Sequence, residues 1–356
     1  MTKITDIEIS LLEIKFDKPR GGSGVHQVDL IAADIRDDDG GTGLGFSYVI
    51  GGGGGIVATI ADQFARRFLD GAEAVHPETH WTEIEASFNR TGGGPNLLAL
   101  AALDVALWDL HARRTDVTLS CAMGGNGGAV PVYGSGGFSP AMGPEEASDT
   151  ALALLAAGFR GVKPRVNAQP ADAAVILAVR AAVGDDISVM VDANEKGDLM
   201  RANRLLSAAA DQGVLFVEEP LPARDMLGYR TLSRNAPCAI AAGEHLQGLD
   251  RFTAMMVDGV VSTIQPDLAM AGGLTPCLAV TRAAAPLGVV VAPHFLPGLF
   301  VQFAGITGSS LWIEDFPLLE EAFEGWPEMA ADGTMAVRET PGHGLTLTDA
   351  ARKARI

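Results

Sequence analysis

The chain of 356 residues has few cysteines, little positive charge and no long apolar run. Three scattered cysteines are too few for a disulfide framework or a cysteine-ligated zinc site. With 26 Lys and Arg against 44 Asp and Glu, the formal net charge is −18, which argues against nucleic acid or an anionic membrane as a partner. A membrane-spanning helix needs about 18 consecutive apolar residues, and the sequence contains no such run. We therefore expect a soluble, cytoplasmic protein that binds neither nucleic acid nor membranes.

The N-terminal third has the pattern of an α+β domain. Residues 1–16 and 28–36 alternate like half-buried strands, and the turn DDDGGTG leads into a third strand, GLGFSYV. The segment between the first two strands, KPRGGSGVHQ, is expected to be a glycine-rich loop. Residues 56–70, 78–88 and 95–115 have helical periodicity, and the last of these is apolar around most of its circumference. We predict a capping domain over residues 1–125.

From about residue 130, short β-rich runs alternate with Ala- and Leu-rich helical stretches. The eight runs are VPVYGSGG, GVKPRV, ISVMVDAN, VLFVEEP, AIAAGEH, STIQPD, GVVVAPH and LWIEDF. Strands that alternate with crossover helices are typical of a parallel barrel. We predict a TIM-like (β/α)7β barrel over residues 126–320, in the α/β class. Residues 321–356 are loop-rich and are expected to pack back on the capping domain.

Three acidic side chains recur at one position of this pattern. Asp192, Glu218 and Glu244 each end a β-rich run, and 26 residues separate each from the next. Because parallel barrel strands end at one rim, we expect these carboxylates to converge in one cavity. Three converging like charges need a cation, and oxygen ligands without Cys or His favour Mg²⁺. The alternative for each acid is an ordinary helix N-cap after its strand, which the matched spacing disfavours.

The next two strands end in a carboxylate and an imidazole. Asp267 and His294 are 27 residues apart, so adjacent strand ends bring them within hydrogen-bond reach. A carboxylate on one ring nitrogen fixes the tautomer and leaves the other nitrogen free for proton transfer. A lone histidine is more often structural, as we expect of His111 and His343. The pairing predicts that His294 acts as an acid or base.

Two further strand ends add charge to the same rim. Lys163 and Arg165 are two residues apart and point to the same side of their strand, and Pro164 between them indicates the strand's end. Glu314 ends the eighth strand and faces the same mouth. The alternative for Glu314 is a solvated or salt-bridged rim acid.

The order and spacing of these motifs resemble the enolase superfamily, in particular its mandelate racemase-like branch of acid-sugar dehydratases. The motifs are VDAN, VEEP, AGEH, QPDLAMAGG and PHF, and the resemblance extends over essentially the whole chain. It implies that a capping domain closes over the site and selects the far end of a small carboxylate substrate, a sugar acid. It also implies a symmetric homo-oligomer, a dimer or an octamer.

The resemblance implies a role for each motif residue. Asp192, Glu218 and Glu244 would hold Mg²⁺, with Glu219 behind them and Asn194 near the substrate. The ion would bind the substrate carboxylate and stabilise the enediolate formed when the α-proton leaves. His294, oriented by Asp267, would be the general base or acid, and Glu314 would hydrogen-bond the substrate carboxylate. Tyr48 and His26 are candidate substrate contacts from the cap.

One position departs from the family pattern. The family usually has Lys-x-Lys on the second barrel strand, and the second lysine is a base; here that residue is Arg165. A guanidinium stays protonated, with a pKa above about 12, and is a poor base at neutral pH. Arg165 then anchors the substrate or stabilises charge, or its surroundings partly deprotonate it, and Lys163 could also serve as an acid or base.

These residues predict a Mg²⁺-dependent dehydratase that converts an aldonate or aldarate to a 2-keto-3-deoxy acid. In a syn elimination, His294 could take the α-proton and then return it to the departing β-hydroxyl. The alternatives are a racemase, epimerase or cycloisomerase of the same superfamily, although Asp267 stands where cycloisomerases usually carry lysine. A barrel that binds a metal or ligand without catalysis is the third interpretation.

Overall fold

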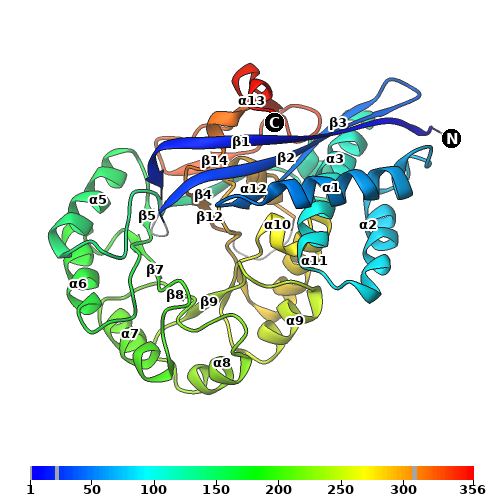
Figure 1. Ribbon diagram of the computed structural model, residues 1–356. Coiled ribbons are helices and arrows are strands. Elements are labelled where there is room, and N and C mark those ends of the chain that lie inside the picture. Colours follow the sequence, from blue (N-terminus) through cyan, green and yellow to red (C-terminus); the bar gives the residue numbers. More distant parts are fainter. Residues whose placement is uncertain (1, 21–23, 307–310) are drawn as a thin grey trace.

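The computed structural model describes residues 2–20, 24–306 and 311–356. The N-terminal part is a three-stranded antiparallel sheet in the order β1 (Ile4–Arg20), β2 (Val25–Asp37) and β3 (Thr42–Ile50). In Figure 1, β1 and β2 run together across the upper part of the view, above the ring of barrel strands and helices. The predicted hairpin between the second and third strands is present, with Arg36 paired to Thr42.

Helices cover one face of this sheet. They are α1 (Gly54–Phe64), which continues into a π-helical turn over Ala65–Leu69, α2 (Pro77–Ala86), followed by a 3₁₀ turn (Ser87–Arg90), and α3 (Pro95–Arg114). As its periodicity predicts, α3 is buried along most of its surface. Gly45 lets α3 lie directly on β3, because a Cβ at that position would come within 2.1 Å of the Ala102 carbonyl oxygen. The short helix α4 (Leu119–Ala122) leads toward the barrel.

Eight parallel strand positions close into the barrel. They are β4 (Ala129–Gly134), β5 (Gly161–Val162), β6 (Ser188–Val189) continued as β7 (Val191–Asp192), β8 (Val217–Glu218), β9 (Ile240–Ala242), β10 (Thr263–Ile264), β11 (Val290–Val291) and β12 (Ile313–Asp315). Hydrogen-bonded pairing runs β12-β4-β5-β6 and β7-β8-β9-β10-β11. A bridge from Val291 to Leu311 closes the ring. All eight predicted strand segments are barrel strands.

In chain order the crossover helices are α5 (Pro144–Ala156), α6 (Asp172–Val183), α7 (Leu199–Asp211), α8 (Met226–Ser233), α9 (Leu249–Val257), α10 (Leu268–Ala271) with α11 (Leu274–Ala284) and a 3₁₀ turn (Ala285–Leu287), and α12 (Pro297–Phe300) with a 3₁₀ turn (Val301–Phe303). Helices α5 to α9 and α11 lie outside the ring, as Figure 1 shows. Seven crossovers between eight strands confirm the predicted (β/α)7β fold with an N-terminal cap. In the described part of the chain, no helix combines the length and apolar character needed to cross a membrane.

The segment predicted as a loop between the first two strands is mostly strand. β1 continues to Arg20 and β2 begins at Val25, with a break in register between Lys15 and Arg20. The glycine-rich composition predicts a loop, but backbone pairing across the hairpin extends both strands, because tertiary pairing overrides a weak local preference. Residues 21–23 of the predicted loop lie outside the described residues.

The C-terminal segment contacts both the sheet and the barrel. Strand β14 (Thr334–Ala336) pairs antiparallel with β4, and β13 (Phe323–Glu324) pairs with β15 (Thr346–Leu347) after a 3₁₀ turn (Glu320–Ala322). After α13 (Asp349–Lys353), the backbone N–H of Ile356 donates to the Leu11 carbonyl on β1. The buried ring of His343 bonds to the Leu44 carbonyl at 2.7 Å, which is the structural role predicted for this histidine.

A buried carboxyl group joins the cap to the barrel. Asp104 on α3 accepts hydrogen bonds from the backbone N–H and hydroxyl of Thr275 on α11, at 2.8 and 2.7 Å. Burial raises the pKa of Asp104 to about 7, although the bonds from Thr275 oppose the rise. The folded state therefore binds more protons than the unfolded state between an ordinary aspartate pKa and about 7.

Stability is expected to fall as the pH rises through this window. Between pH 5 and 7, protonated Asp104 should make the wild-type free energy of unfolding fall by up to about 1.4 kcal/mol per pH unit. Asp104→Asn should lack this part of the fall. Urea unfolding at several pH values measures this slope, with Asp149→Asn on the exposed surface of α5 as the control. Equal slopes in wild type and Asp104→Asn would contradict the protonation of Asp104.

Candidate functional site

The residues singled out by spacing lie at the carboxyl ends of the barrel strands. Asp192 and Glu218 end β7 and β8, and Glu244 follows β9 by two residues. The other strand-end residues come from neighbouring positions of the ring: Lys163 after β5, Asp267 after β10, His294 after β11 and Glu314 within β12. The barrel thus brings side chains from seven strands to one rim.

Glu218 is fully buried among other charges. Its Oε2 accepts hydrogen bonds from Lys163 Nζ and Gln265 Nε2, each at 2.6 Å, while its buried Oε1 has no partner. Burial raises the pKa of Glu218 well above its usual range; Lys163 opposes this, and Asp192 and Glu244 add to it. A buried carboxylate oxygen without a donor, beside two more carboxylates, is suited to a hard cation.

A second group of possible ligands lies beside these acids. One ligand atom from each of Glu195, Glu219 and His245 lies within 4.8 Å of the other two, and this is the one grouping of that kind among the described residues, so Asp192, Glu218 and Glu244 lie too far apart to form another. His245 Nδ1 is 2.8 Å from Glu219 Oε1 and 3.6 Å from Glu244 Oε1. Burial and Glu244 raise the pKa of Glu219 to about 8, while the bond to Glu219 raises that of His245 to about 9.

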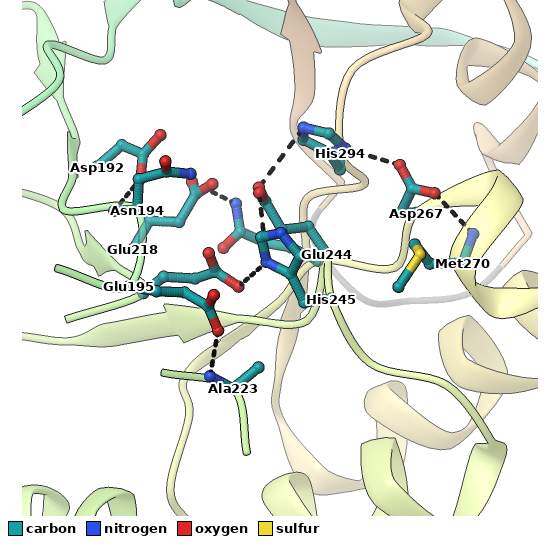
Figure 2. A network of polar contacts seen from close by, with 12 residues as sticks. Asp192, Asn194, Glu195, Glu218, Ala223, Glu244, His245, Asp267, Met270 and His294 are labelled. Carbon is teal, nitrogen blue, oxygen red and sulfur yellow. Dashed lines mark hydrogen bonds and ion pairs between the residues drawn. The ribbon is translucent and has the colours of Figure 1, made fainter. Parts of the chain in front are cut away.

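Asp267, which is buried, pairs with the partly exposed His294, and Figure 2 shows His294 between Asp267 and Glu244. His294 Nδ1 lies 2.7 Å from Asp267 Oδ2, and its Nε2 lies 3.5 Å from Glu244 Oε2. Tyr48 from the cap donates its hydroxyl to Asp267 Oδ2, and the backbone N–H of Met270 donates to Oδ1 at 2.8 Å. Asp267 is thus also the N-cap of α10, which fixes its position beside the imidazole.

Charge around His294 favours the imidazolium in the protein without a metal. Burial lowers its pKa, but Glu244 and Asp267 raise it more, to about 10. The negative charge that holds this proton belongs to the acids at the rim. A cation at Glu244 would therefore lower the pKa of His294, so that the ring is neutral and can act as a base.

The two cations of the second strand have different environments. Lys163 Nζ is fully buried, 2.6 Å from Glu218 and 2.8 Å from Glu314. Burial lowers the pKa of Lys163, but these two carboxylates raise it well above its usual range, so the side chain is a fixed ammonium. Burial raises the pKa of Glu314, but the opposing effect of Lys163 and His294 is larger, and together they bring this pKa down to about 2.

Arg165 lies closer to the open cavity. Its Nε is 3.6 Å from Asp192 Oδ2, and its guanidinium lies 4.9 Å from the centre of the Phe316 ring. Burial lowers the pKa of Arg165, but Asp192, Glu314 and Glu244 raise it above its usual value. A side chain that stays charged fits the anchoring role and not the role of a base.

A cavity of about 400 Å³ lies between the cap and this rim. Arg165, Asn194, Glu244, Asp267 and His294 line it, and the cap adds Tyr48. Tyr48 therefore reaches the cavity, although its hydroxyl is bonded to Asp267.

The expectation for His26 has to be corrected. His26 is exposed and does not line the cavity, whereas its neighbour Val25 does. Successive side chains of a strand point to opposite faces, so when Val25 faces the cavity, His26 faces away from it.

Three residues near the acids were not predicted from the spacing: Glu195, His245 and Gln265. Gln265 could have been found, because it stands two residues before Asp267 and thus on the same side of the strand. Glu195 and His245 come after their strands have ended, where alternation no longer predicts direction. Asn194, Glu195 and Glu219 have positive φ angles of 43°, 61° and 41°, which redirect the chain at the rim.

The fold and rim define a capped (β/α)7β barrel with clustered acids and one His–Asp pair. A family model described as enolase C-terminal domain-like matches residues 146–351, and one for the mandelate racemase/muconate lactonizing enzyme N-terminal domain matches residues 21–124. The chain belongs to the enolase superfamily, in its mandelate racemase-like group.

Relatives in this group have more than one activity. The chain is 32% identical to a 3,6-anhydro-alpha-L-galactonate cycloisomerase of Streptomyces coelicolor, over 90% of this chain and 89% of the relative. It is 31% identical to an L-talarate/galactarate dehydratase of Salmonella typhimurium, over 92% and 82%. Its structure is similar to that of an L-talarate dehydratase from Polaromonas sp. JS666 complexed with Mg and L-glucarate, with a TM-score of 0.92, 30% identity, and coverage of 100% and 98%.

Proposed function

We propose that this protein is a Mg²⁺-dependent dehydratase of a sugar acid, forming a 2-keto-3-deoxy acid. The observation that carries the proposal is the asymmetry of the site. His294 and Asp267 form an acid–base pair on one side of the cavity, while the position of a second base holds Arg165, paired with Asp192. A site with one base suits an elimination, because proton removal and loss of the hydroxyl can use the same group in turn.

Asp192, Glu218 and Glu244 would hold the cation, with Glu219 behind them. The donor set fits, because it offers carboxylate oxygens alone, and Glu218 Oε1 is buried without a partner. When bound, Mg²⁺ would neutralise these acids and offset the negative charge that develops on the substrate carboxylate. The Mg-bound relatives support this assignment.

The remaining steps belong to side chains of this chain. Neutral His294 takes the α-proton through Nε2, while Asp267 holds Nδ1 and stabilises the imidazolium. Lys163 and Arg165 supply fixed positive charge near the substrate carboxylate, and Glu314, ion-paired with Lys163, accepts a hydrogen bond from a substrate hydroxyl or from bound water. His294 then returns the proton to the departing β-hydroxyl, which leaves as water, and the resulting enol becomes the 2-keto acid.

A cycloisomerase is the second candidate, because the relatives include a 3,6-anhydro-alpha-L-galactonate cycloisomerase at 32% identity. Such an enzyme also removes or adds a proton next to a carboxylate, so the same pair could serve it. The two reactions differ in their products: a dehydratase releases water and forms a keto acid, whereas a cycloisomerase opens or closes a ring without loss of water.

The test is a screen of the Mg²⁺-loaded protein against aldonates, aldarates and their lactones and anhydro forms. A carbonyl reagent detects 2-keto acids, and NMR in D₂O follows both the α-proton and ring opening. Keto-acid formation supports the dehydratase. Ring opening without water loss supports the cycloisomerase, and α-proton exchange alone indicates racemase or epimerase chemistry.

Arg165→Lys tests the absence of a second base. Lysine can lose its proton when a nearby cation lowers its pKa, so with Mg²⁺ bound this variant should gain solvent-deuterium exchange on the face opposite His294. We expect dehydration to fall about tenfold, because an ammonium cannot offer the forked pair of donors with which a guanidinium binds a carboxylate. Arg165→Met is the control: it should lose dehydration without gaining exchange. Unchanged dehydration in Arg165→Met would contradict the assignment of Arg165 as an anchor.

A further inference from the structure

The two walls of the cavity differ in charge. All but one of the ionisable side chains that line the cavity come from the barrel: Arg165, Glu195, Glu244, His245, Asp267 and His294. The cap side is apolar apart from Tyr48 and consists of Val25, Val49, Ile50 and Leu98, which form the apolar wall, while the barrel loops add Ala269, Met270 and Phe316. Tyr48 is the one ionisable group on the cap side of the cavity, and its hydroxyl already donates to Asp267.

We infer, on the basis of the proposed function, that the substrate is a monocarboxylate sugar acid whose far end is uncharged, and that the matching diacids are rejected. One carboxylate is bound at the metal and the cations of the rim. The far end of the same molecule then lies against the apolar wall, where a hydroxymethyl or methyl group is accommodated and a second carboxylate has no partner.

Among the described residues that line the cavity, Arg165 is the one side chain that is always a cation, and it lies beside Asp192, while both histidines already contact carboxylates. Arg165 lies 3.6 Å from Asp192, His294 lies 2.7 Å from Asp267, and His245 lies 2.8 Å from Glu219. A second substrate carboxylate would have to displace one of these acids or stay unpaired. Burying an unpaired charge is strongly unfavourable, and Glu195 and Glu244 would add repulsion.

Other cations near the cap are held elsewhere. Arg20 donates to the Pro317 carbonyl at 2.8 Å and to Glu321 at 3.0 Å, and it does not line the cavity. Lys18 is exposed and is also absent from the lining. Residues 21–23 and 307–310, which are outside the described part of the chain, are Gly, Ser and Thr and carry no charge.

An adjoining cavity of about 950 Å³ contains Arg224 and Arg251. It shares Glu195, His245 and Met270 with the smaller cavity. Glu195 lies where the two cavities meet, and its carboxylate would repel a substrate carboxylate directed toward those arginines. The larger cavity therefore does not supply the missing partner for a diacid.

The test uses sets of three compounds with the same configuration at C2 to C5: the aldonate, its 6-deoxy form and its aldarate. For the Mg²⁺-loaded enzyme we expect kcat/KM for the aldarate to be about 100-fold below that for the aldonate, with the 6-deoxy form equal to the aldonate or better. Leu98→Arg places a cation in the apolar wall and should raise the aldarate-to-aldonate ratio about tenfold or more. Ile56→Arg, on the exposed surface of α1, should leave the ratio unchanged.

Binding of the same compounds to the His294→Asn protein, which should not turn them over, gives the aldarate-to-aldonate ratio of affinities. Aldarates that bind and react as well as aldonates overturn the inference and leave the dehydratase standing. If no sugar acid reacts, the proposed function fails; tighter binding of the aldonate then still supports the inferred selectivity, and equal binding overturns it. An unchanged ratio in Leu98→Arg also counts against the apolar wall as its cause.

Discussion

His294→Asn is expected to lower kcat for dehydration by about 10³-fold or more, because it removes the group that both takes and returns the proton. Asparagine can keep a hydrogen bond to Asp267, so the buried carboxylate retains a partner and the fold should persist. Binding of Mg²⁺ and substrate should change little, since the proposed ligands and the cations of the rim are untouched. Rapid mixing with keto-acid detection measures kcat, and calorimetry measures binding.

The control for this variant is His76→Asn, which changes an exposed histidine at the start of α2, outside the cavity lining. It should leave kcat unchanged. Exchange of the α-proton with D₂O should disappear together with dehydration in His294→Asn. If that variant keeps a tenth or more of wild-type kcat, another group removes the proton and the one-base proposal is wrong.

Chelation of the metal is expected to abolish turnover, with a loss of about 10³-fold or more that added Mg²⁺ reverses. The physical reason lies in the rim itself. Without a cation, Glu244 helps to raise the pKa of His294 to about 10, so the ring is protonated and cannot act as a base at neutral pH. The developing negative charge on the substrate would also lie beside uncompensated carboxylates.

Mg²⁺ should also stabilise the fold. Above its dissociation constant, each tenfold rise in free Mg²⁺ should add about 1.4 kcal/mol to the free energy of unfolding, because the ion binds the folded state alone. Glu218→Gln should weaken this dependence and raise the Mg²⁺ concentration needed for activity, whereas Glu145→Gln, exposed on α5, should change neither. Full activity after exhaustive chelation would contradict a metal-dependent reaction.

Much of the fold could be predicted because barrel sequences repeat a simple unit. Each β-rich run followed by a helix forms one unit, and parallel strands place all their carboxyl ends at one rim. The spacing of 26 residues between Asp192, Glu218 and Glu244 therefore predicts their common position from the chain alone. The 27-residue spacing of Asp267 and His294 predicts their pairing, which the 2.7 Å contact now shows.

The directions of the side chains beyond the strand ends could not be predicted in this way. Glu195, Glu219 and His245 lie one to three residues past the predicted acids, where the regular alternation has stopped. Positive φ angles at Glu195 and Glu219 redirect the chain there, and tertiary contacts hold those angles. Within the cap, β1 extends through a glycine-rich stretch, and the alternation along β2 turns Val25 inward and His26 outward.

The sequence by itself determined the barrel, the cap and the order of acids, cations and histidine around the rim, because periodicity and strand-end spacing are local properties of the chain. Only the tertiary structure decided what surrounds them. Tyr48 reaches Asp267 across 219 residues of sequence, and the cap lines the cavity with apolar side chains while the barrel supplies the charged ones. Such contacts depend on how two separately patterned parts pack together, and no local pattern in either part encodes that packing.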